Sequence, residues 1–127
     1  MRVLAVDDDA DFLDLLGFQF LQADITLEPC TSGSQALRLL DERCFDVVMV
    51  DLIMPAMDGR ALVRHIRRRP RVADIPIIMM THMANVRSIN AANPGEANHF
   101  VDKGGEPECL IQLVSHLGGR RAALRTV

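Results

Sequence analysis

Four short apolar runs in this chain end at polar or charged side chains of a few chemical types. The runs with the residues that follow them are Val3–Val6 before Asp7, Asp8 and Asp9; Val47–Val50 before Asp51; Ile77–Met80 before Thr81; and Phe100–Val101 before Asp102 and Lys103, the only lysine. Parallel strands end at one edge of their sheet, so carboxylates, a hydroxyl and an ammonium group would gather there. Such a set predicts a site for a divalent cation and a phosphoryl group.

Helical patterns separate the apolar runs along the chain. The predicted strands are residues 3–6, 25–27, 47–50, 75–80 and 100–101, and the predicted helices are residues 12–20 (with Asp9 as N-cap), 36–40, 62–66, 84–92 and 107–117. Five strands alternating with five helices predict an α/β doubly wound domain with a five-stranded parallel sheet. The first, third and fourth strands are almost entirely apolar, so we expect them at the centre of the sheet.

The length and composition fit one globular domain. The chain has 127 residues, of which 49% are hydrophobic and 24% charged. We expect the domain to span residues 1–118, with residues 119–127 as a tail or the start of a linker, although a cap or a continuing helix is equally open from Gly118. Three cysteines without C-x-x-C spacing, a strand directly after Met1 and no long apolar run favour a cytoplasmic protein with reduced thiols and no membrane contact.

The chain resembles the receiver domain of two-component response regulators over nearly its whole length. The matching pieces are Val6–Asp9, Asp51–Gly59, Thr81 and Lys103, in order and each at the end of a predicted strand. The resemblance implies a flavodoxin-like fold with strand order 2-1-3-4-5, in which the first and third strands are neighbours. Ligands bind at this switch point in such sheets, where the aspartates would meet.

The resemblance also implies a chemistry for the aspartates. Asp8 and Asp51 would bind Mg²⁺ directly, Asp7 would bind it through water, and the backbone carbonyl of Ile53 would complete the protein ligands. Asp51 would be the nucleophile that accepts a phosphoryl group from a histidine kinase or a histidine phosphotransfer protein. The domain would then be a phosphoacceptor and not an enzyme, with at most self-phosphorylation and self-dephosphorylation activity.

Further residues would stabilise the phosphoryl group and respond to it. By resemblance, Thr81 and Lys103 would bind its oxygens, and Phe100 would turn inward when Thr81 moves toward it. Ile53 and Met83 would flank the approach of a hydrolytic water, and both are apolar, so we expect a long-lived phosphoryl group.

Two departures from the family pattern stand beside the predicted site. His82 follows the hydroxyl where a small residue is usual, and its ring could restrict access or donate to the phosphate. Gly104 and Gly105 follow the lysine where proline is usual, which puts in doubt the cis peptide and the rigid loop of the family. The interruption at Asn93–Gly95 predicts a short or mobile fourth helix.

Two classes of function remain open at this stage. One is a phosphorylation-controlled signalling receiver that switches the binding of a downstream protein or effector domain, as a monomer or as a phosphorylation-dependent dimer. The other is a pseudo-receiver, an interaction module independent of phosphate. Each feature alone has an ordinary structural explanation, but the complete set favours the first. The arginines of residues 64–71 have no interleaved aromatic residues, so we expect no nucleic-acid binding by this domain.

Overall fold

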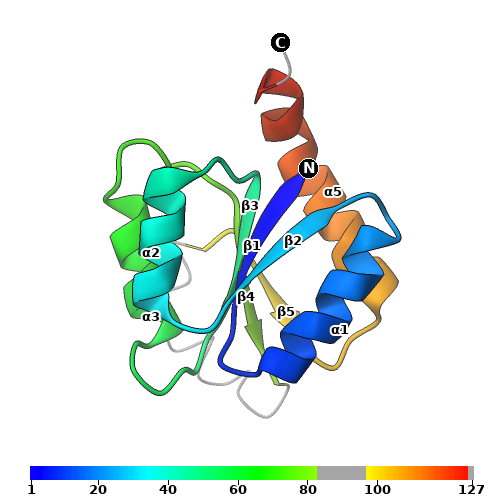
Figure 1. The fold of residues 1–127 in the computed structure, drawn as a ribbon, viewed down its shortest axis with the longest axis horizontal. Coiled ribbons are helices and arrows are strands. Elements are labelled where there is room, and N and C mark those ends of the chain that lie inside the picture. Colours follow the sequence, from blue (N-terminus) through cyan, green and yellow to red (C-terminus); the bar gives the residue numbers. More distant parts are fainter. Residues whose placement is uncertain (83–96, 126–127) are drawn as a thin grey trace.

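The computed structural model describes residues 1–82 and 97–125, which form a parallel sheet with helices on both faces (Figure 1). In chain order the elements are β1 (Arg2–Val6), α1 (Ala10–Leu21), β2 (Thr26–Cys30), α2 (Gly33–Glu42), β3 (Val47–Asp51), α3 (Gly59–Arg67), β4 (Ile77–Thr81), β5 (His99–Asp102) and α5 (Pro107–Arg125). The strand order is β2-β1-β3-β4-β5, and every neighbouring pair is parallel. The predicted fold class and strand order are confirmed. The helix predicted at residues 84–92 lies outside the described residues.

The central strands are buried on both faces, which explains their continuous apolar character. In β1, Val3 and Ala5 pack on the side of α1 and α5, whereas Leu4 and Val6 pack on the side of α2 and α3. Figure 1 shows these two helix pairs on opposite faces of the sheet. Successive side chains of a strand point to opposite faces of the sheet. A strand covered on both faces therefore has no solvent-facing positions, and polar residues do not alternate with apolar ones along it.

Helix α1 presents a different face to the core than its apolar spacing predicted. The spacing favoured Leu15 as a core position, but its side chain is 60% exposed. The buried residues of the helix are Leu13, Leu16 and Phe20. Phe18 and Leu21 are also exposed, so α1 carries apolar side chains around much of its circumference and its periodicity does not identify the buried stripe.

All five strands differ slightly in extent from the prediction, and β2 and β4 differ most. β2 begins and ends later than residues 25–27, and it includes Pro29, which an edge strand tolerates because one side of its backbone is not paired. β4 begins at Ile77 because Pro76 precedes it and cannot donate a backbone hydrogen bond to the ladder.

Helix α5 continues well beyond Gly118, which is one of the alternatives that the sequence left open. Figure 1 shows its last turns extending past the start of β1. Arg121 ties this part of the helix to the domain: its Nε donates to the carbonyl of Phe45 at 3.2 Å, and its Nη1 contacts Asp74 at 3.1 Å. The domain boundary at residue 118 stays a prediction. Among the described helices, none is long and apolar enough to cross a lipid bilayer.

Candidate functional site

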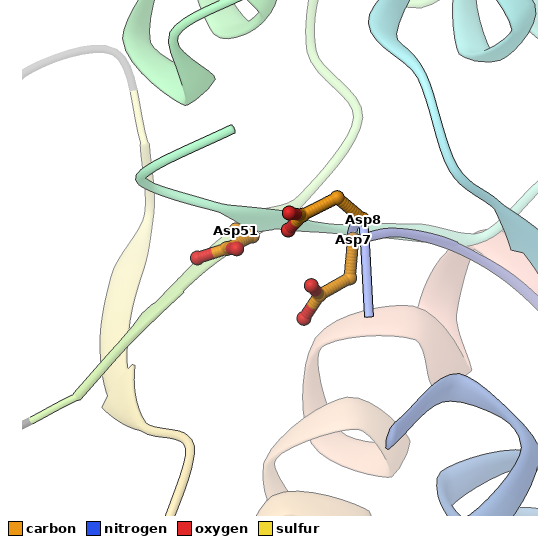
Figure 2. A group of neighbouring side chains, drawn as sticks. All are labelled: Asp7, Asp8 and Asp51. Carbon is orange, nitrogen blue, oxygen red and sulfur yellow. The ribbon is translucent and has the colours of Figure 1, made fainter. Parts of the chain in front are cut away.

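Three aspartates meet at the carboxyl ends of the two neighbouring strands β1 and β3. Val6 pairs with Val50, so Asp7 and Asp51 follow at the same level of the sheet. Figure 2 shows the carboxylates of Asp7, Asp8 and Asp51 close together. One oxygen of each lies within 4.8 Å of the others. Asp7 and Asp51 are buried and Asp8 is exposed, so the cluster opens to solvent on the side of Asp8.

The turn after β1 is held by the side chains of its own aspartates. Asp7 Oδ1 accepts a hydrogen bond from the Asp9 backbone N–H at 3.0 Å. Asp9 Oδ1 in turn accepts from the Phe12 N–H at 3.1 Å and caps α1, as the sequence predicted. The three consecutive aspartates therefore have different surroundings: Asp7 faces the pocket, Asp8 faces solvent and Asp9 begins the helix.

The turn after β3 depends on a close backbone approach. Asp51 Oδ1 accepts from the Ile53 N–H at 3.4 Å, and Asp58 caps α3 by accepting from the Arg60 N–H at 2.7 Å. A Cβ at Gly59 would lie 2.2 Å from the backbone oxygen of Asp51. Only glycine fits where the start of α3 touches the end of β3. This contact explains why glycine follows the capping residue Asp58.

Lys103 brings positive charge to the aspartates from the end of β5. Its Nζ lies 2.7 Å from Asp7 Oδ2 and 3.7 Å from Asp51 Oδ2, and its side chain is 8% exposed. Burial acts to lower the pKa of Lys103, but the hydrogen bond and charge of Asp7, with Asp51 and Asp9, outweigh burial and raise that pKa. Lys103 is therefore held in its charged form.

One ammonium group does not balance three carboxylates. Burial, followed by the negative charge of Asp7, raises the pKa of Asp51 from 3.8 to about 6, although Lys103 opposes this shift. Carboxylate oxygens are the ligands that Mg²⁺ prefers, and a divalent cation would supply the missing charge. The donor set of Asp7, Asp8 and Asp51 therefore fits a hard divalent ion.

The loop after Lys103 is ordered by Asp102, a residue with no predicted role of its own. Asp102 Oδ1 accepts from the Gly104 N–H at 3.0 Å, and its carbonyl accepts from the Gly105 N–H at 3.1 Å. The Lys103 N–H donates to the carbonyl of Thr81 at 2.9 Å. No cis peptide occurs among the described residues. Aspartate side chains commonly form such turns, so an aspartate followed by Lys103 and two glycines could have predicted this one from the sequence.

The remaining predicted residues differ in their exposure to solvent. Thr81 is buried, and its hydroxyl is 3.5 Å from the His82 carbonyl, to which it donates. Phe100 is half-buried and packs against the core on the side of α2 and α3. Ile53 is 58% exposed and His82 is exposed. Met83 lies outside the described residues. The functional roles of these residues remain predictions.

Comparisons with known proteins agree on one family. Residues 3–115 match the response regulator receiver domain. The chain is 32% identical to an uncharacterised 14.6 kDa protein of Leptolyngbya boryana, over 90% of this chain and 87% of that protein. It is 29% identical to the regulatory protein VanRB of Enterococcus faecalis, over 98% of this chain and 55% of VanRB.

Two solved structures with a similar fold are described as response regulators. A putative response regulator from Chloroflexus aurantiacus matches with a TM-score of 0.85 and 26% identity, over 93% of this chain and 97% of that one. The chemotaxis response regulator CheY4 of Vibrio cholerae matches with a TM-score of 0.82 and 26% identity, over 91% and 97%. The chain spans about half the length of VanRB and most of the length of the others. By fold, by acidic pocket and by sequence match, the chain belongs to the response regulator receiver domain family.

Proposed function

We propose that Asp51 accepts a phosphoryl group from a histidine kinase or a histidine phosphotransfer protein, and that its phosphorylation switches the binding of a downstream protein. A receiver domain implies a histidine kinase as partner. The observation that carries the proposal is the position of Asp51, buried at a strand end with Asp7, Asp8 and Lys103 around it. The chain is a phosphoacceptor domain and not an enzyme in the usual sense.

The aspartates would also hold Mg²⁺. Asp8 and Asp51 would be direct ligands, Asp7 would bind through water, and the carbonyl of Ile53 would supply a further oxygen. When bound, Mg²⁺ would neutralise the carboxylates and the charge that develops on the transferring oxygens. The mutual distance of at most 4.8 Å between ligand oxygens supports this assignment.

The transfer forms one bond and breaks another. A carboxylate oxygen of Asp51 attacks the phosphorus of a phosphohistidine, a P–O bond forms, and the P–N bond breaks as the imidazole leaves with its electron pair. Lys103 would stabilise negative charge on the phosphoryl oxygens because its ammonium already lies 3.7 Å from Asp51. The nucleophile must be ionised, and a pKa of about 6 leaves Asp51 mostly ionised at neutral pH.

Thr81 and Phe100 would carry the signal away from the site. The Thr81 hydroxyl donates to a backbone carbonyl in the described structure, so it would turn to reach a phosphoryl oxygen. Phe100 is half-buried on the neighbouring strand and would follow into the space that Thr81 leaves. A shift between mostly inactive and mostly active populations needs about 5 kcal/mol of differential affinity.

The lifetime of the phosphoryl group would depend on the residues at the pocket mouth. Ile53 is apolar and exposed beside Asp51, and Met83 is also apolar, so neither can orient a water in line with the phosphorus. His82, which directly follows Thr81 in the chain, would modulate access to the pocket. We therefore expect slow hydrolysis.

The proposal is tested by the intact mass of the full chain after incubation with Mg²⁺ and acetyl phosphate. Wild type should gain one phosphoryl group, and D51N should gain none because an amide is a poor nucleophile. D14N is the matched control: it makes the same substitution at an exposed aspartate of α1 and should be labelled like wild type. Chelation of Mg²⁺ should abolish the labelling of wild type and of D14N.

Two outcomes would contradict the proposal. Undiminished labelling of D51N would show that another residue accepts the phosphoryl group. Absence of labelling in wild type, together with unchanged amide spectra on addition of beryllofluoride and Mg²⁺, would favour the pseudo-receiver alternative.

A further inference from the structure

An aromatic ring lies against the ammonium group at the centre of the site. Nζ of Lys103 is 4.6 Å from the centroid of the Phe12 ring. The same nitrogen contacts Asp7 Oδ2 at 2.7 Å and Asp51 Oδ2 at 3.7 Å. The face of an aromatic ring attracts a cation, and the attraction is stronger where water is excluded. The ammonium is therefore held between carboxylates and a ring, with only 8% of its side chain exposed.

The backbone of Phe12 is linked to the pocket through Asp9 and Asp7. Asp7 accepts a hydrogen bond from the Asp9 N–H, and Asp9 accepts one from the Phe12 N–H. These two hydrogen bonds connect the pocket to the first turn of α1. They hold the backbone of Phe12, from which the ring projects. Phe12 is thus tied to the site by the backbone as well as by its side chain.

The lysine has room to leave the pocket if the ring is removed. A groove of about 190 Å³ lies between α1 and the loop after β5, and Phe12 and Lys103 both line it with Leu16, Val101 and Leu110. Lys103 has a flexible four-carbon stem, and glycines rather than a proline follow it. The Asp102 turn orders the backbone of this loop, but it does not restrain the side chain of Lys103.

We propose that Phe12 is a positioning residue for phosphoryl transfer: its ring closes the groove side of Lys103 and keeps the ammonium within reach of the phosphoryl group on Asp51. This inference rests on the proposed function. Phe12 does not itself touch the reacting atoms; it acts through Lys103. The expected contribution to phosphoryl binding is roughly three- to thirty-fold.

The first test measures the affinity of the full chain for beryllofluoride in the presence of Mg²⁺, followed by amide shifts. F12L keeps an apolar side chain but removes the ring, and should bind roughly three- to thirty-fold more weakly. F12W restores a ring and should bind at least as tightly as wild type. F18L makes the same change at an exposed ring on the same helix and should match wild type. In a K103M background, F12L should cause no further loss.

The second test needs neither metal nor phosphoryl analogue. Lys103 is the only lysine, so ¹³C-labelled lysine gives one set of side-chain signals. Its ε-methylene protons should be shifted upfield by the Phe12 ring current in wild type and F18L. In F12L they should move to the position of a lysine without an aromatic neighbour.

The outcomes separate this inference from the proposed function. Equal beryllofluoride affinity in wild type and F12L, or an equal loss in F12W and F12L, would overturn the role of Phe12 alone. An F12L loss that persists in the K103M background would show that the ring acts on packing and not through the lysine. Failure of wild type to bind beryllofluoride would overturn the proposed function, and this inference with it.

Discussion

Asp51 and Asp7 share a single ammonium group, that of Lys103. This balance of charge determines the pH at which Asp51 takes up a proton. Without metal, burial and the charge of Asp7 hold the pKa of Asp51 at about 6. The folded protein therefore binds a proton at Asp51 more tightly than the unfolded chain, whose aspartate titrates near 3.8. The stabilisation from this proton is complete below the unfolded pKa and is lost as the pH rises through the folded pKa.

The sign of this linkage predicts that D51N stabilises the metal-free domain. At pH 7 wild type carries an unfavourable buried charge that the amide lacks, so D51N should be more stable by on the order of 1–3 kcal/mol. The gain should shrink as the pH falls from 6 toward 4, because wild-type Asp51 then becomes protonated. Urea unfolding in a chelator across this pH range measures the difference.

Mg²⁺ and an exposed aspartate provide the controls for this prediction. Saturating Mg²⁺ should stabilise wild type more than D51N and narrow the difference, since the ion binds the charge that the variant lacks. D14N should stay within about 0.5 kcal/mol of wild type, as surface substitutions usually do. A D51N variant less stable than wild type at pH 7 in chelator would contradict this account of the charge balance.

At the scale of elements, one arginine joins the end of α3 to the loop before β4 and to Asn98, which directly precedes β5. Nη1 of Arg67 donates to the carbonyls of Ala73 at 3.0 Å and Ile75 at 2.6 Å, and Nη2 donates to Asn98 Oδ1 at 2.9 Å. The same Asn98 oxygen accepts from the Ile77 N–H at 2.7 Å. The sequence predicted no specific contact for the arginines of residues 64–71, whereas in the structure Arg67 binds the loop before β4 and the residue before β5.

Replacement of this arginine should cost stability, because it leaves the carbonyls of the loop before β4 without their charged donor. R67M should lower the free energy of unfolding by about 1.5–3 kcal/mol, the range for hydrogen bonds to charged groups. R64M changes an exposed arginine on the same helix and should lower it by less than about 0.5 kcal/mol. Urea unfolding midpoints of the two variants measure this contrast; equal midpoints would contradict the role of Arg67.

At the scale of the whole molecule, the sequence was most informative where chemistry and topology coincide. Apolar runs that end in Asp7, Asp51, Thr81 and Lys103 predicted the parallel sheet, its central strands and the edge that carries the site. Burial on both faces leaves a continuous apolar signal, and parallel strands place their ends together. The strand order came with the family resemblance, and the structure confirms it.

The features that the sequence did not predict depend on contacts between distant segments. Leu15 has helical spacing, but only the packing of α1 decides which of its apolar faces is buried. The hydrogen bond of Arg67 to Asn98 joins residues separated by 31 positions. The ring of Phe12 meets Lys103 across the fold, so its spacing predicted a core position and nothing about the site.

The central claim is that the acid of β3, and no neighbouring acid, receives the phosphoryl group. The tryptic peptide Cys44–Arg60 contains three aspartates: Asp46, Asp51 and Asp58. Wild type labelled with acetyl phosphate and Mg²⁺ can be reduced with borohydride, which converts an aspartyl phosphate to homoserine, and fragmented by mass spectrometry. The account predicts homoserine at position 51 alone. Homoserine at Asp46 or Asp58, or in the peptide that contains Asp7 and Asp8, would contradict it.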